Sequence, residues 1–285
     1  MPNKNVSRRD FLKRAGVVAG GLAVVSLPGV LHGITAQKAS AAPSEAPATK
    51  LAGAKAVASA DVPTHDWAFV VDTERCIGCG NCVRACKNEN KVPWEPEYNR
   101  TWVERYTITE DDQVYVDSPN AGRDGFREEP ANIKYQNLNV SKAFFVPKLC
   151  NQCEKPPCVS VCPVGATYKT KEGVVLVDQF HCVGCRYCVQ ACPYGARYVL
   201  PTASETYFGQ VHVVDKCTWC YHRTTKGLLP ACVEVCPRGA RMFGDLSDPN
   251  STVSTVLREK RVYTLKPELG TEPKVYYLGF EKGVM

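Results

Sequence analysis

The sequence predicts an α+β protein in which short strands and short helices alternate around loops that carry cysteines. Three observations predict this class. The 16 cysteines of the 285-residue chain fall into four groups of four with similar spacing. Runs of mostly β-branched residues that end in Asp, at 69–72, 174–178 and 211–215, predict buried strands a few residues before three of these groups. Three groups end in Cys-Pro-x-Gly-Ala, where proline stops a short helix and glycine permits a turn into a strand.

The spacing of the cysteines indicates their chemistry. The groups are Cys76-x2-Cys79-x2-Cys82-x3-Cys86, Cys150-x2-Cys153-x4-Cys158-x3-Cys162, Cys182-x2-Cys185-x2-Cys188-x3-Cys192 and Cys217-x2-Cys220-x11-Cys232-x3-Cys236. A cubane iron–sulfur cluster needs four thiolates at one site, and a Cys-x2-Cys-x2-Cys loop supplies three of them. In the bacterial two-cluster pattern, the cysteine after the x3 gap binds the other cluster. The sequence therefore predicts 4Fe-4S clusters and, with them, electron transfer.

Structural zinc and disulfide bonds are two other uses of closely spaced cysteines. Zinc sites take two close pairs and leave the repeated third and fourth cysteines of each group without a role. A chain of 285 residues is long enough to bury cores without disulfide bonds. Both alternatives therefore fit the spacing less well than iron–sulfur clusters do.

The N-terminus has the form of an export signal. Residues 7–13 read Ser-Arg-Arg-Asp-Phe-Leu-Lys, typical of a twin-arginine signal, and glycines and Pro28 interrupt the apolar stretch at 15–31. That stretch is too short and too broken to span a membrane. We expect a signal peptide at 1–41, a linker rich in Ala, Ser and Pro at 42–64, and a periplasmic mature protein.

Charge and composition narrow the choice of partners. Residues 1–41 hold six Lys or Arg and one Asp, so most of the net charge of +6 belongs to the signal, and about +1 remains for the mature chain. This balance gives no support to nucleic-acid binding. The mature chain has no direct membrane span and no spare cysteine for a lipid anchor, so we expect it to reach the membrane through a partner.

The order of the groups predicts the domain organisation. Groups two and three are separated by nineteen residues, enough for one hairpin, so they should share a domain. Group one then pairs with group four across them, which predicts two tandem, nested bacterial-ferredoxin-like domains. Domain A comprises residues 65–146 and 207–245 with an insert at 87–147, domain B comprises 147–206, and an extended C-terminal arm covers 246–285.

Four stretches make the chain resemble a known family, the four-cluster ferredoxin-type subunits of molybdopterin oxidoreductases such as tetrathionate, polysulfide and dimethyl sulfoxide reductases. These stretches are Leu149–Tyr168, Cys182–Tyr198, Asp215–Arg241 and Leu265–Gly279. The resemblance implies four 4Fe-4S clusters held by four ligand sets. The first set is Cys76, Cys79, Cys82 and Cys236; the second is Cys86, Cys217, Cys220 and Cys232; the third is Cys150, Cys153, Cys158 and Cys192; the fourth is Cys162, Cys182, Cys185 and Cys188.

Three functions compete at this point. The first is an electron-transfer subunit of anaerobic respiration, placed between a quinone-reactive integral membrane subunit and a molybdopterin catalytic subunit. The second is the same conduit in a molybdenum-free quinone complex with multihaem cytochromes. The third, an enzyme with its own catalytic residues, is disfavoured because the chain has no spare cysteine, nucleotide-binding loop or paired catalytic groups.

Basic residues close to the cysteines are candidates for tuning the clusters, because positive charge raises a reduction potential. They are Arg75, Lys148, Arg186, Lys216, Arg223, Arg238 and Arg241. For each of them, an ordinary solvated surface charge is an equally good interpretation of the sequence.

Overall fold

The computed structural model describes residues 65–126 and 139–279. The predicted signal peptide at 1–41 and the predicted linker at 42–64 lie outside the described residues, as do residues 280–285 of the predicted arm. Within the described ranges, no helix is both long and apolar enough to cross a bilayer.

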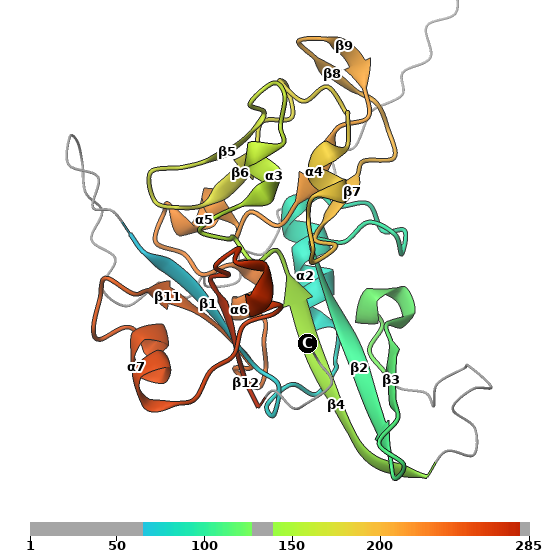
Figure 1. Ribbon diagram of the computed structural model, residues 1–285, viewed down its shortest axis with the longest axis vertical. Helices are drawn as coiled ribbons and strands as arrows, with labels where there is room; N and C mark the ends of the chain where they lie inside the picture. The colour runs from blue at the N-terminus through green and yellow to red at the C-terminus, as the bar shows by residue number, and fades with distance from the viewer. Residues whose placement is uncertain (1–64, 127–138, 280–285) are drawn as a thin grey trace, which may run out of the picture. The chain divides into compact units, whose positions relative to one another are not determined.

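Short helices and strands alternate along the described chain, which confirms the α+β class (Figure 1). The helices are α2 (Asn81–Asn90), α3 (Pro157–Ser160), α4 (Tyr187–Gln190), α5 (Tyr221–Thr224), α6 (Ala231–Glu234) and α7 (Thr252–Glu259), and the 3-10 turns are η1 (Pro119–Gly122) and η3 (Pro267–Leu269). The strands are β1 (Trp67–Asp72), β2 (Thr101–Thr109), β3 (Val114–Asp117), β4 (Val140–Leu149), β5 (Thr167–Lys169), β6 (Val175–Val177), β7 (Arg197–Val199), β8 (Ser204–Thr206), β9 (Gly209–Val211), β10 (Val214–Lys216), β11 (Arg241–Asp245) and β12 (Val275–Leu278).

A three-stranded sheet joins the two ends of the described chain, with β1 between β11 and β12 (Figure 1). β1 pairs antiparallel with β11, from Trp67 opposite Asp245 to Val71 opposite Arg241, and parallel with β12. All six residues of β1 are buried, as expected for a strand covered on both faces. The strand before cysteine group one therefore lies beside the strand that follows group four.

The segment predicted as an insert, residues 87–147, forms most of a second sheet with the order β3-β2-β4. β2 and β4 run antiparallel, from Thr101 opposite Leu149 to Thr109 opposite Val140. Leu149 is buried in the largest core of the protein. Because β4 ends at this residue, the sheet positions the cysteine that follows it.

Short two-stranded ladders connect the remaining cysteine groups. β5 and β6 form the hairpin that the spacing between groups two and three predicts. β7 pairs with β10, so one ladder crosses the predicted boundary between residues 206 and 207. The run at 211–215, predicted as one strand, is divided between β9 and β10 at His212 and Val213.

Residues 246–279 differ from the extended arm that the sequence predicts. Ser251 caps α7 by accepting a hydrogen bond from the backbone N–H of Ser254, and Val253 of this helix packs in a core with Val70 of β1. β12 then adds a parallel strand to β1. The partner strand of β12 lies at the opposite end of the described chain, so the local sequence does not show this pairing.

Candidate iron–sulfur cluster sites

The first set of cysteines lines one cavity beside α2. Cys76, Cys79 and Cys82 come from the loop after β1 and the first turn of α2, and Cys236 comes from the turn after α6. Pairing of β1 with β11 brings the loop after one strand to the turn before the other. Arg241, the first residue of β11, lines the same cavity.

The second set lines another cavity. Its members are Cys86 of α2, Cys217 and Cys220 of the loop after β10, and Cys232 of α6. Residues four apart lie on one face of a helix, so α2 supplies Cys82 to the first cavity and Cys86 to the second. This division is the pattern that two-cluster ligation requires.

The third set, Cys150, Cys153, Cys158 and Cys192, lines a third cavity. The first three residues follow the end of β4 and enter α3, and Cys192 follows α4. Arg197 at the start of β7 also lines this cavity. Three of the four predicted sets are thus each gathered around one cavity.

The fourth set lies closer to solvent. Cys182 and Cys188 are buried in a small core against which Cys162 packs. Cys185 is exposed, and it is the one exposed cysteine of the sixteen. The structure therefore brings three of these four residues into one core and leaves the fourth beside it at the surface.

The buried thiols favour a positively charged occupant. Burial raises the pKa of Cys76 to about 11, and it raises the pKa of Cys153 and of Cys217 to about 12. Burial is the largest cause of these rises, and other cysteines of the same set contribute to them, because neighbouring thiolates repel one another. Iron of an iron–sulfur cluster supplies the compensating charge, and sulfur is its preferred ligand. The donors and their burial fit such a cluster.

Backbone N–H groups point at several sulfur atoms. Ala240 N donates to Cys236 Sγ at 3.2 Å, and Thr167 N donates to Cys162 Sγ at 3.4 Å. Burial alone would raise the pKa of Cys162, but N–H groups that include Thr167 hold it below its ordinary value. The positive φ of Gly239 turns the backbone toward the sulfur. Such hydrogen bonds tune cluster potentials.

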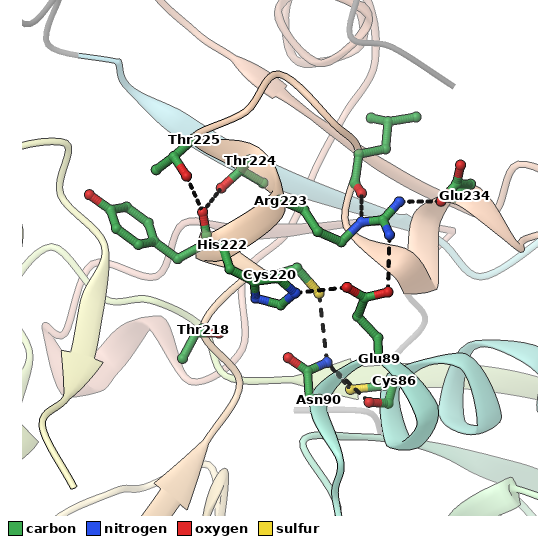
Figure 2. A network of polar contacts seen from close by, with 12 residues as sticks. Cys86, Glu89, Asn90, Thr218, Cys220, His222, Arg223, Thr224, Thr225 and Glu234 are labelled. Atoms are coloured by element: carbon green, nitrogen blue, oxygen red, sulfur yellow. Dashed lines mark hydrogen bonds and ion pairs between the residues drawn. The ribbon is translucent and has the colours of Figure 1, made fainter. Parts of the chain in front are cut away.

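Asn90 links two thiols of the second set (Figure 2). Its Nδ2 lies 3.5 Å from Cys86 Sγ and 3.7 Å from Cys220 Sγ. Arg100 Nη1 donates to Asn90 Oδ1 at 2.8 Å, which orients the amide so that its N–H groups face the sulfur atoms. The cysteine spacing did not indicate Asn90, since it stands outside every motif.

A second polar network ties α5 to α2 and α6 (Figure 2). Glu89 accepts from Arg223 Nη1 at 3.0 Å and lies 2.7 Å from His222 Nε2, and Arg223 also pairs with Glu234. These contacts hold the long Cys220-x11-Cys232 loop closed. Glu89 and Glu234 therefore compensate the charge of Arg223, so this arginine is a weaker candidate for tuning a cluster.

The other basic residues that the sequence suggested for tuning the clusters differ in how deeply they are buried. Arg75, Arg186 and Arg238 are exposed. Lys148 pairs with Glu104 at 2.7 Å. Lys216 and Arg241 are buried, at 0% and 2% exposure. A further buried arginine, Arg197, was not among the candidates, although it occupies the same place after Cys192 as Arg241 does after Cys236.

Within residues 65–126 and 139–279, no three His, Cys, Asp or Glu side chains are gathered tightly enough to hold a single metal ion. The cavities described above are a different arrangement. In a cubane cluster each thiolate binds its own iron, so the four sulfur atoms surround a group of atoms.

Two protein-family models match the chain, and both are described as a 4Fe-4S dicluster domain, at residues 75–166 and 141–246. The B subunit of tetrathionate reductase from Salmonella typhimurium is 37% identical over 281 residues, which cover 98% of this chain and 90% of that protein. The putative dimethyl sulfoxide reductase iron-sulfur protein of Halobacterium salinarum, also a B subunit, is 42% identical, covering 76% of this chain and 80% of that protein.

The Hdr-like menaquinol oxidoreductase iron-sulfur subunit 1 of Archaeoglobus fulgidus is 35% identical, covering 74% of this chain and 82% of that protein. The matches show two ferredoxin-like domains that bind 4Fe-4S clusters. They also show an electron-transfer subunit of an oxidoreductase complex rather than its catalytic subunit. The chain therefore belongs to the family of iron–sulfur B subunits of the molybdopterin oxidoreductases.

Proposed function

We propose that this protein is a periplasmic subunit that passes single electrons through four 4Fe-4S clusters. The electrons move between a quinone-reactive membrane subunit and a molybdopterin reductase subunit. The observation that carries the proposal is that twelve of the sixteen cysteines line three cavities, four to each cavity. When bound, the clusters supply reversible one-electron chemistry.

The proposed ligands are the four sets named above, in a nested arrangement of domains A and B. Pairing of β1 with β11 supports the nesting, because it joins groups one and four around the intervening groups. The fourth set is supported by a small core that contains Cys182 and Cys188 and packs against Cys162; Cys158 of the neighbouring third set lies in the same core. The exchange of one cysteine between partner sets follows the bacterial two-cluster pattern.

The four sets follow one another as a series. Burial raises the pKa of Cys232, and Cys82 of the first set raises it further. Burial likewise raises the pKa of Cys217, and Cys150 of the third set adds to that effect. Members of these three sets, Cys82, Cys150, Cys217 and Cys232, also share one core, so the second set has the first and the third as its neighbours. This order would let an electron pass from one cluster to the next.

The series continues from the third set to the fourth. Burial raises the pKa of Cys188, and Cys158 of the third set contributes to the rise. The exposed Cys185 then gives the fourth set access to the surface. A conduit needs such an accessible end, because its electrons must enter from or leave to another protein.

The proposal is tested by purifying the native complex under anaerobic conditions through this subunit. We expect about sixteen iron atoms and about sixteen acid-labile sulfides per chain, together with molybdenum or tungsten at about one per chain. Zinc without sulfide would contradict the cluster assignment.

A second candidate keeps the conduit but changes its partner. One relative is named as a subunit of a menaquinol oxidoreductase, which supports a quinone-linked complex. In this candidate the complex contains no molybdenum, and its other partners are multihaem cytochromes. Abundant haem with neither molybdenum nor tungsten in the purified complex would favour this second candidate over the first.

A further inference from the structure

Two buried arginines occupy the same place in a sequence repeat. Two of the three Cys-Pro-x-Gly-Ala segments continue into arginine, so that Arg197 follows Cys192, and Arg241 follows Cys236, by five positions. Each arginine is the first residue of a strand, β7 or β11. Both side chains therefore leave the backbone at equivalent points of the two predicted domains.

Arg241 lies between the first and second sets. It is 2% exposed and lines the first cavity. Its Nη2 donates to Thr101 Oγ1 at 2.8 Å, and its guanidinium carbon lies 6.0 Å from the centre of the Phe69 ring. Thr101 and Phe69 both line the second cavity, so the guanidinium lies at the boundary of the two sets. Nε and Nη1 find no acceptor within the described ranges.

Arg197 repeats this arrangement between the third and fourth sets. It is 5% exposed and lines the third cavity. Its Nη1 donates to Thr167 Oγ1 at 3.3 Å. Thr167 in turn donates its backbone N–H to Cys162 Sγ of the fourth set, so the guanidinium lies at the boundary of the two sets. Nη2 has no acceptor among residues 65–126 and 139–279.

The two guanidinium groups require a negative partner. Both side chains are buried, and each keeps at least one N–H group without an acceptor among the described residues. A buried cation is costly unless it is paired and hydrogen-bonded. An oxidised 4Fe-4S core with four thiolates carries a net charge of about −2, so a cluster on each side meets this requirement.

We propose that Arg241 and Arg197 are positioning residues, each of which donates N–H···S hydrogen bonds and positive charge to two neighbouring clusters at once. Arg241 serves the first and second sets, and Arg197 serves the third and fourth. The threonines hold one edge of each guanidinium, and the N–H groups without an acceptor face the clusters. This inference rests on the proposed function, since it requires the four sets to hold clusters.

The effect on electron transfer follows from charge. Reduction of a cluster adds one electron and no other group, so a nearby cation stabilises the reduced form and raises the reduction potential. A cation shared by two clusters raises both potentials together.

The test is a redox titration of the purified complex in which electron paramagnetic resonance monitors the reduction of each cluster. We expect Arg241→Gln to lower the potentials of two clusters and Arg197→Gln to lower those of the other two. In each case we expect at least a tenfold change in the equilibrium between oxidised and reduced forms, which is about 59 mV for a one-electron couple.

Arg75→Gln and Arg186→Gln are matched controls. Each removes one positive charge beside Cys76 or Cys185, but both side chains are exposed, so water and salt screen the charge. We expect smaller shifts from these variants than from the buried ones. Glutamine variants at Arg241 and Arg197 with full iron content and unchanged potentials would overturn the inference.

Iron and sulfide contents separate failure of the inference from failure of the proposed function. A wild-type protein without clusters would refute the proposed function itself. If a glutamine variant loses its clusters, its potentials cannot be measured, and the inference is tested on the wild-type protein instead. The cells are grown on arginine labelled with 15N in the guanidinium group, and electron paramagnetic resonance detects whether this nitrogen couples to a cluster. Hyperfine coupling of 15N to the reduced clusters is expected, and it should persist in the Arg75→Gln/Arg186→Gln protein. Its absence there would overturn the inference.

Discussion

At the scale of single residues, Arg100 and Asp215 form a largely buried ion pair. Arg100 Nε and Nη2 donate to the two carboxylate oxygens of Asp215 at 2.8 and 2.9 Å. We expect Arg100→Leu to lower the free energy of unfolding by about 3–5 kcal/mol, because Asp215 is left buried without a cation. Denaturant titrations followed by cluster absorbance measure this change.

The double variant Arg100→Leu/Asp215→Leu should lose less than the sum of the two single variants, because it strands no charge. Additive losses would show that the two residues act independently. Lys155→Leu serves as the control, since Lys155 forms an exposed ion pair with Glu272, and we expect no measurable change from its loss.

The sequence revealed the cysteines more readily than the residues that support them. The x2 and x3 gaps recur in every group, so spacing predicted that the cysteines bind clusters, and the resemblance to a family implied how they divide into sets. Arg197 could have been found by comparing the residues after each Cys-Pro-x-Gly-Ala segment, because the repeat continues to that position. Asn90 could not, since its contacts with Cys86 and Cys220 depend on how α2 packs.

At the scale of elements, the loop before α4 depends on a close approach to the residues between β9 and β10. Gly184 has a φ of +67°, and an added Cβ would lie 2.5 Å from the carbonyl oxygen of His212. Because that contact is with backbone, neither group can move aside cheaply. We therefore expect Gly184→Ala to lose the fourth cluster, about four iron atoms per chain.

Gly195→Ala separates this contact from the conformational preference of glycine. Gly195 has a φ of +61°, but an added Cβ would meet nothing within 4 Å. We expect a cost of roughly 1 kcal/mol from the left-handed conformation and a full iron content. Equal iron loss in both variants would mean that the left-handed backbone conformation, rather than the contact with His212, causes the loss of the cluster.

The same contact explains why one predicted strand was wrong in its bounds. The apolar run at 211–215 has the composition of a single strand, yet β9 ends at Val211 and β10 begins at Val214. The carbonyl of His212 faces the cysteine loop at Gly184 in between. Local composition favours a strand, but it carries no information about a loop that approaches from elsewhere in the chain.

At the scale of the whole molecule, the nested arrangement predicts which cysteine variants should resemble each other. Cys76→Ser and Cys236→Ser should perturb the same cluster, although 160 positions separate the two residues. Cys86→Ser should perturb the cluster of Cys217 instead. Electron paramagnetic resonance spectra of the reduced variants distinguish these outcomes. A shared signature of Cys76→Ser and Cys86→Ser would contradict the nesting.

Long-range pairing limited what the sequence could predict about the chain as a whole. The order of the cysteine groups predicted that the first and last groups meet, and the β1–β11 pairing agrees with that idea. The addition of β12 to the same sheet was not predicted, because no cysteine marks that segment. Cysteine spacing therefore predicts how the cysteine-bearing segments are arranged, but not how the other segments pair.

The exposed Cys185 also bears on the lifetime of the protein in air. Oxidants and chelators reach an exposed thiolate more easily than the buried members of the other sets. If the four sets hold clusters as we propose, oxidative damage would begin at the fourth cluster. Its loss would stop electron transfer along the series while the other three clusters keep their iron. A sample stored in air would then keep most of its iron and yet transfer no electrons.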